Sequence, residues 1–132
     1  MTDDVDAARE HIRADPFCGT LGIDFATIEP GYAETTLTVT EDVVNFNGKL
    51  HGAVIFALAD AAAAAATQAD GQTVVGIETN TSFLSAAEPG DTLIATARII
   101  HESSQLNGTR VVVEKEDGTQ IAMFRVRGYR IE

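Results

Sequence analysis

One carboxylate, Asp60, stands inside a run of alanine and aliphatic residues, where an unpaired charge is costly to bury. At helical spacing its neighbours on the same face are Phe56, Ala57, Ala63 and Ala64, and none of them is basic. A carboxyl group in such surroundings either obtains partners from elsewhere or has a raised pKa. Asp60 is therefore a candidate general base or nucleophile. The plainer interpretation is an acid that faces solvent.

The start of the same apolar run holds a second group that could do chemistry. His51 and Gly52 precede the run, so the Gly52 N–H would lie in the first turn of a helix. N–H groups of a first turn have no partner within the helix and lie at the positive end of its dipole. Such a donor suits an oxyanion that develops at an attacked carbonyl. The plainer interpretation is a turn glycine beside a surface or capping histidine.

The spacing between these two groups bears on the number of chains in the site. Gly52 and Asp60 are eight residues apart, a rise of about 12 Å along an α-helix. One chain therefore cannot easily aim both groups at one carbonyl carbon, whereas two antiparallel copies of the helix can. If both groups serve one reaction, the spacing predicts a site shared between two subunits.

The elements around these residues follow from hydrophobic periodicity and turn signals. A short helix is expected over 4–14, ending before Pro16, and a long helix from about 51 to 68. Strands are expected over 21–29, 32–40, 73–85, 92–102, 109–116 and 120–131, with a loop from 41 to about 50. The chain has no internal repeat and no composition break. We expect one α+β domain over 1–132, with an N-terminal helical segment at 1–16 and an antiparallel sheet.

The long helix is apolar on nearly every side, because residues 61–66 are all alanine. A helix of this kind is normally buried on nearly every side. Small side chains also allow another backbone to approach closely. The composition therefore predicts a sheet wrapped around this helix, with part of the helix facing a second subunit.

The charge balance is strongly acidic, with 20 acidic and 9 basic residues and a net charge of −11. Phosphate repulsion makes nucleic acid an unexpected partner. Acid-rich composition with few lysines also suits a halophilic protein kept soluble in high salt, the alternative being an ordinary acidic cytosolic protein. The apolar run is too short and interrupted for a membrane span, and no secretory signal is visible, so a cytoplasmic location is expected.

The cysteine and histidine residues of the sequence give little support for a disulfide, a metal site or a cysteine nucleophile. Cys18 is the only cysteine, which excludes an internal disulfide and a cysteine metal cluster. The three histidines are scattered without the spacing of metal ligands, so no metal is expected. Cys18 is a weak candidate nucleophile, since a lone cysteine is usually a small apolar residue.

The pattern Asn45-x-x-Gly48-x-x-His51-Gly52, followed by Phe56-x-Leu58-Ala59-Asp60, resembles the PaaI-type branch of the hotdog-fold acyl-CoA thioesterases. That branch includes proteins of phenylacetic acid degradation. The resemblance implies a hotdog fold, an antiparallel sheet wrapped around one long central helix. It also implies a homodimer that joins two sheets edge to edge, with a homotetramer expected, and no cofactor beyond the CoA of the substrate.

The resemblance also implies roles for individual residues. Asp60 would be the general base or nucleophile, the Gly52 N–H would hold the thioester oxygen, His51 would position that end, and Asn45 would orient the water or the acid. Gly48 and Phe56 of the motif are expected to contact substrate. Some relatives carry a hydroxyl on the strand after the helix, where this chain has Gly76. The substrate-contacting hydroxyls expected instead are those of Thr79 and Thr81.

Two further departures concern the motif and the CoA phosphates. The family usually has a second glycine after His-Gly, and here it is Ala53. Many relatives have a basic stretch between the later strands, whereas residues 101–108 contain no Arg or Lys. Lys49 and Arg110 are the nearest cations in sequence.

The predicted reaction is hydrolysis of an aromatic or medium-chain acyl-CoA, phenylacetyl-CoA among them, to a free acid and CoA. Three phenylalanines expected in core elements, Phe25, Phe56 and Phe83, suggest an apolar acyl pocket. A hydratase of the same fold is one alternative, weakened because no histidine follows Asp60 before His101. A non-catalytic acyl-CoA binding or sensing module is the other alternative, weakened because binding alone would not require the acid.

Overall fold

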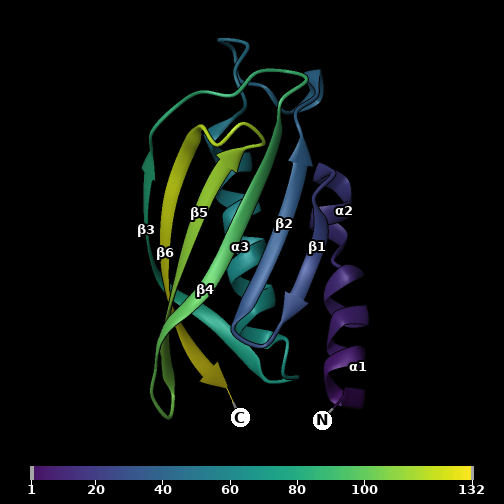
Figure 1. Ribbon diagram of the computed structural model, residues 1–132, viewed down its shortest axis with the longest axis vertical. Helices are drawn as coiled ribbons and strands as arrows, with labels where there is room; N and C mark the ends of the chain where they lie inside the picture. Colours follow the sequence, from purple (N-terminus) through teal and green to yellow (C-terminus); the bar gives the residue numbers. More distant parts are fainter. Residues whose placement is uncertain (1, 132) are drawn as a thin grey trace.

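The computed structural model describes residues 2–131, which form a six-stranded antiparallel sheet with a long helix against one face (Figure 1). The strand order is β1-β2-β4-β5-β6-β3. The elements, in chain order, are α1 (Thr2–Arg13), α2 (Pro16–Leu21), β1 (Asp24–Glu29), β2 (Tyr32–Thr38), the 3-10 turn η1 (Glu41–Val43), α3 (Gly52–Gln68), β3 (Thr73–Phe83), β4 (Thr92–Glu102), β5 (Leu106–Lys115) and β6 (Gln120–Ile131). This is the predicted α+β architecture. Residues 1 and 132 of the predicted domain lie outside the described part.

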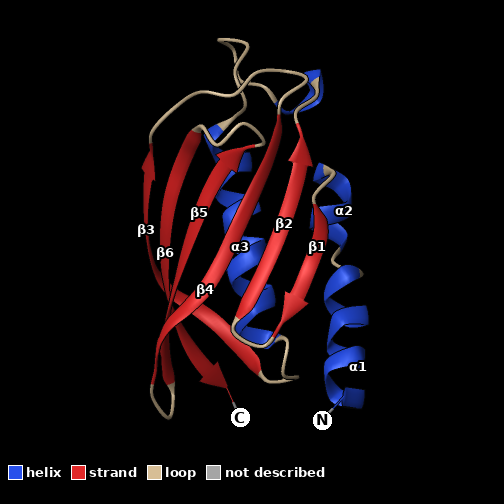
Figure 2. Ribbon diagram, in the orientation of Figure 1, coloured by secondary structure: helices blue, strands red, loops and turns tan. Residues whose placement is uncertain are grey.

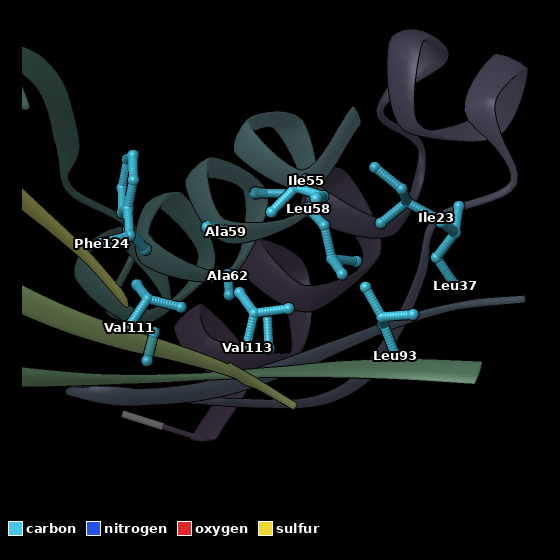
Figure 3. Close-up of a cluster of buried hydrophobic side chains, with 14 of the residues drawn as sticks. Ile23, Leu37, Ile55, Leu58, Ala59, Ala62, Leu93, Val111, Val113 and Phe124 are labelled. Carbon is cyan, nitrogen blue, oxygen red and sulfur yellow. The ribbon is translucent and has the colours of Figure 1, made fainter. Parts of the chain in front are cut away.

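Helix α3 lies behind the curved sheet, which wraps around it (Figure 2). Alanines make this approach possible on both sides of the contact: Ala59 and Ala62 of α3 are buried, and so are Ala33, Ala95 and Ala97 of the sheet. Larger side chains fill the space on either side of these alanines (Figure 3). Within residues 2–131, no helix is both long and apolar enough to cross a membrane.

The N-terminal segment differs from its prediction. The first helix ends at Arg13 as expected, but Pro16 begins a second helix, α2, instead of closing the helical segment at residue 16. Proline suits the first position of a helix, where its missing N–H would have no partner anyway. Asp15 caps this helix, because its side chain accepts a hydrogen bond from the Cys18 N–H at 3.0 Å.

The strand predicted over 109–116 begins three residues earlier, at Leu106. This places Asn107 and Thr109 on the face of the sheet that is turned toward α3, where both are buried. The prediction failed here because polar residues in 103–107 are typical of a loop.

The three phenylalanines that were predicted to lie in core elements are not fully buried. Phe83 is 55% exposed and Phe56 is 36% exposed, and Phe25 is only partly buried against the core. The fully buried phenylalanine is Phe124 of β6, which meets the edge of Phe56 with ring centroids 5.1 Å apart. The aromatic side chains of α3 and β3 therefore stand at a surface of the protomer.

The two edge strands of the sheet differ in what covers them. At the β1 edge, α1 lies alongside, and its arginines donate to strand carbonyls: Arg9 Nε to Ile28 at 2.7 Å and Arg13 to Phe25 at 3.3 Å. At the other edge, β3 pairs with β6 alone, and nearly all its residues are exposed, Val75, Ile77 and Phe83 among them. An exposed apolar edge strand is a ready template for pairing with another strand.

Candidate active site

The first turn of α3 carries one free N–H donor. His51 is the N-cap residue: its Nδ1 accepts from the Ala53 N–H at 3.0 Å, and its carbonyl accepts from Val54 and Ile55. Among residues 2–131, no acceptor takes the Gly52 N–H. Since Nδ1 is an acceptor, a neutral His51 carries its proton on Nε2. The helix start therefore presents an unpaired Gly52 donor at its positive end.

The loop before α3 is organised by Asn45. Its Oδ1 accepts from the N–H groups of Asn47 at 2.9 Å and Lys49 at 3.2 Å, and its backbone closes two further bonds with Gly48 and Lys49. Gly48 has φ = +76°, a conformation that L side chains rarely adopt. Asn45 and Gly48 thus fix the conformation of the loop that precedes and positions His51. The side-chain oxygen of Asn45 is used internally, while its amide N–H groups stay available.

Asp60 lies in the middle of α3, on a stripe with Ala53 and Phe56 that remains exposed in the protomer. The composition predicted a helix buried on nearly every side, with part of it facing a second subunit. In the protomer most of α3 is buried and this one stripe is exposed. Partial burial among apolar neighbours raises the pKa of Asp60, and the negative charge of Asp15 raises it further. A carboxyl group of this kind holds its proton more tightly than an ordinary aspartate and makes a stronger base when ionised.

Cys18 of α2 lies near both acids and is buried. Burial, followed by the charge and hydrogen bond of Asp15, raises the pKa of the Cys18 thiol to about 12. Because the thiolate is the reactive form, Cys18 does not serve as a nucleophile.

The exposed stripe of α3 faces the inner side of β3. Thr79 and Thr81 pair with Val126 and Phe124 of β6, whose side chains point toward α3, so the two threonines lie on that same face. At the start of the helix, a Cβ added to Gly52 would lie 3.5 Å from the ring of Phe83.

Gly76 of β3, which stands where some relatives are expected to carry a hydroxyl group, lies beside Asp60. Asp60 and Gly76 line one cavity of about 160 Å³ between α3 and the sheet. The other residues of this cavity are Ala63, Ala64, Thr67, Val74, Asn107, Val126 and Gly128. Sequence reasoning missed Asn107, and the signal that could have found it is an asparagine at an inward position of an otherwise apolar strand, Asn107-x-Thr109-x-Val111-x-Val113.

Three arginines form a row across the outer face of the sheet. The sequence analysis named Arg110 but did not predict that the three lie side by side. Arg98 of β4 pairs with Arg110 of β5, which pairs with Arg125 of β6. Arg98 also lies over the ring of Tyr32, 4.6 Å from its centroid. Lys49, the other expected cation, is 3.0 Å from Glu88 in an ion pair.

The structure thus brings Asn45, Gly48, His51 and Gly52 together at one end of α3. It places Asp60 two helical turns away, with Thr79 and Thr81 across from the stripe that carries it. Within one protomer, the Gly52 donor and the Asp60 carboxylate do not meet.

Comparisons with known proteins agree with this fold. The profile of the thioesterase superfamily matches residues 47–122. The Escherichia coli acyl-coenzyme A thioesterase PaaI is 34% identical over 111 residues, covering 84% of this chain and 79% of that protein. Its structure superposes with a TM-score of 0.93, covering 98% of this chain and 95% of that one.

Two further relatives show the same relationship. The 1,4-dihydroxy-2-naphthoyl-CoA hydrolase of Listeria monocytogenes is 36% identical over 102 residues, covering 74% of this chain and 82% of that protein. The structure of the TT0310 protein of Thermus thermophilus matches with a TM-score of 0.85 and 30% identity, covering 89% of this chain and 98% of that one. The chain belongs to the thioesterase superfamily, in its PaaI-type branch, and is a hotdog-fold enzyme.

Proposed function

We propose that this enzyme hydrolyses an acyl-CoA to a carboxylic acid and free CoA at a site shared between two subunits. The observation that carries the proposal is the pairing of a free Gly52 N–H with a raised-pKa carboxyl group, Asp60, about two turns along the same helix. In an antiparallel pair of α3 helices, the first turn of one helix lies opposite the middle of the other.

The surface of the protomer supports a homodimer built on β3. The outer edge of β3 has no strand partner among residues 2–131 and carries exposed apolar side chains, whereas α1 covers the opposite edge of the sheet. Phe46, in the loop before α3, is 99% exposed, which is unfavourable for an aromatic side chain without a covering surface. Joining two β3 strands would bury the exposed stripe of α3 and supply a second subunit for Phe46 to contact. A homotetramer, formed by two such dimers, remains part of the proposal.

The chemistry assigns a role to each group. Ionised Asp60 takes a proton from water as the water oxygen attacks the thioester carbonyl, or it attacks the carbonyl itself and forms an anhydride that water then cleaves. The Gly52 N–H of the partner subunit stabilises the developing oxyanion. In the first route, protonated Asp60 returns its proton to the sulfur as the C–S bond breaks, and CoA leaves as the thiol. In the second route, the C–S bond breaks as the anhydride forms, and CoA leaves as the thiolate, which takes a proton from solvent. His51 holds the helix start in place, and the amide group of Asn45 orients the water or the acid.

The proposed acyl group is aromatic or of medium length. The aromatic side chains of Phe56 and Phe83 stand at the surface where the two subunits would meet, and Thr79 and Thr81 lie on the face of β3 that is turned toward α3. Gly48, in the loop before α3, stays a predicted substrate contact. The names of two relatives point to CoA esters, one of them aromatic. Phenylacetyl-CoA is therefore the first substrate to test.

The test measures free-thiol release from phenylacetyl-CoA, hexanoyl-CoA and acetyl-CoA at low and at molar KCl, for the wild type and for Asp60→Asn. We expect wild-type turnover and a fall of about 100-fold or more in the variant, because the amide can neither accept the proton nor attack. Negligible rates for both proteins, with CoA esters still bound, would instead indicate a binding module. Asp24→Asn, at an exposed aspartate of β1 on the opposite edge of the sheet, is the matched control and should keep wild-type activity.

A further inference from the structure

The loop before α3 presents an uncovered aromatic side chain on a well-held support. Phe46 is 99% exposed. The loop that carries it is closed by a bridge between Val44 and Leu50 and by the hydrogen bonds of Asn45, and it projects past the first turn of α3 (Figure 1). A loop already held in one conformation loses little freedom on binding, and an aromatic side chain gains much from burial in a pocket. These are the features of an interface anchor.

A cavity between α1 and α3 has the size to hold such a side chain. It measures about 350 Å³, whereas a cavity of about 150 Å³ already holds a benzene molecule. The lining of this α1–α3 cavity includes Ile12, Phe25, Ala61, Ala64, Ala65 and Gln68, and His11 and Asp15 add polar groups to it. Three of the lining residues are alanines of α3, so the space exists because their side chains are small.

The α1–α3 cavity lies beside the surface that the proposed dimer would cover. Ala64 and Gln68 are partly exposed and continue the exposed stripe of α3 at helical spacing from Asp60. Both residues line the cavity. The cavity is therefore continuous with the stripe on which the partner subunit would sit.

The spacing along the chain brings the loop of one subunit to the cavity of the other. In the antiparallel pair of α3 helices proposed above, Gly52 lies opposite Asp60 of the partner subunit, so residues before Gly52 lie opposite residues after Asp60. Two to three residues of extended chain carry Phe46 about 7–10 Å beyond Leu50. That distance corresponds to about five to seven residues of an α-helix. Phe46 would thus lie opposite the part of α3 that begins near Ala65, where the cavity opens.

We propose that Phe46 of each subunit inserts into the α1–α3 cavity of its partner and anchors the loop that carries Asn45 at the shared site. This inference rests on the proposed function, because it requires the shared-site dimer. A two-fold axis makes the contact twice in each dimer. It makes α1 a wall of the dimer interface, although α1 runs along the edge of the sheet remote from β3. It also holds the Asn45 amide near Asp60 of the partner subunit.

The first experiment uses tryptophan fluorescence. The chain has no tryptophan, so Phe46→Trp adds a single reporter. We expect its emission to be blue-shifted and protected from acrylamide in the dimer, and exposed in the monomer obtained by dilution, with sedimentation velocity identifying the species. Glu29→Trp, at the exposed end of β1 on the edge away from β3, is the matched control and should emit alike at every concentration.

The second experiment fills the cavity from within the protomer. Ala14 is exposed and lines the cavity, so Ala14→Phe should occupy the space and exclude Phe46. Phe46→Ala and Ala14→Phe should each raise the dissociation constant of the dimer by about 100-fold or more, because each dimer loses two contacts. Together they should cost no more than Phe46→Ala alone, since no ring remains to be excluded. Circular dichroism checks that each variant is folded.

Three outcomes would overturn the inference. They are an exposed tryptophan in the dimer of Phe46→Trp, additive effects of the two substitutions on dissociation, and a protein that stays monomeric at every concentration. If Ala14→Phe does not fold, the fluorescence of Phe46→Trp decides alone.

Thiol release keeps this inference distinguishable from the proposed function. Hydrolysis by a dimer whose reporter is exposed would leave the thioesterase proposal standing while the inference fails. A reporter that becomes buried on dimerisation and is displaced by Ala14→Phe, without any hydrolysis, would support the inference while the thioesterase proposal fails.

Discussion

At Gly52 a single N–H group can be removed without disturbing the helix that carries it. Gly52 is the first residue of α3, a position that favours proline, and His51 has the extended backbone that a residue before proline needs (φ −64°, ψ 134°). We expect Gly52→Pro to lower kcat by about 100- to 1,000-fold through the loss of one oxyanion donor. Initial rates, together with a circular dichroism spectrum, measure this effect.

Gly52→Ala is the matched control, because it keeps the N–H and its Cβ meets Phe83 at an ordinary contact distance of 3.5 Å. If alanine and proline reduce kcat to the same extent, the N–H is not the donor that stabilises the oxyanion.

Asp60 should make the folded protein less stable at neutral pH than an uncharged side chain would. Its folded-state pKa lies above the unfolded value, mainly through desolvation, so the ionised form opposes folding. Asp60→Asn should therefore raise the melting temperature at pH 7. The advantage should shrink as the pH falls through the raised pKa and vanish below about 4, where the aspartate is protonated even in the unfolded chain. Melting curves from pH 3 to 8 measure it, and an equal gain at every pH would contradict the argument.

The contrast between Asp60 and Asn107 shows what sequence reasoning can find. Asp60 could be predicted because its neighbours in the chain are themselves apolar, so the conflict is visible in one segment. The environment of Asn107 comes from β6, α3 and β3, which are far away in sequence. Its polar neighbours Ser103, Ser104 and Gln105 indicate a loop, and only the sheet register reveals that it is buried.

At the scale of the elements, strand β5 places Arg110 between two other arginines, which is electrostatically unfavourable. Arg110 stands directly opposite Arg98 on one side and Arg125 on the other, and like charges in such positions repel. We expect Arg110→Thr to raise the free energy of unfolding by about 0.5 kcal/mol in low salt, with the gain fading as salt screens the row. Urea titrations at 10 mM and 1 M KCl measure the difference.

Arg127→Thr is the control on the same face, because Arg127 lies 3.5 Å from Glu78 and has an opposite charge beside it. Its removal should leave stability unchanged or slightly lower in low salt. A gain equal to that of Arg110→Thr would attribute the effect to something other than the repulsion within the row.

The elements themselves were largely predictable, since each carries its own periodicity and turn residues. The hairpin of β1 and β2, the long helix α3 and the strands after it appear close to the expected ranges. The strand order was not predicted, because no local pattern states that β3 ends at the edge beside β6. The helix α2 was missed because Pro16 was interpreted as a stop, although it occupies a starting position.

For the whole molecule, the shared site predicts complementation between two inactive variants. A mixed dimer of Asp60→Asn and Gly52→Pro contains one site with both groups intact and one with neither. Random exchange of subunits makes half of the dimers mixed, so about one quarter of wild-type activity should return. The measurement is thiol release after the two proteins are unfolded together and refolded.

Refolding each variant alone is the control and should return no activity. If the mixture also stays inactive while mixed dimers are shown to form, both groups belong to one chain and the shared site is wrong. The acidic composition makes salt concentration a necessary variable here, because repulsion between subunits of net charge −11 weakens as salt is added.

The close approach of Gly128 to Asn107 also limits the order in which this sequence can change. A side chain gained first at 128 would meet both Asn107 Oδ1 and Val74 Cγ1 at 2.7 Å. A smaller residue gained first at 107 relieves one of these contacts and leaves the ladder between β5 and β6 intact. The two positions are therefore coupled in descent: loss of the amide at 107 removes one of the two close contacts that oppose a side chain at 128, and the contact with Val74 remains.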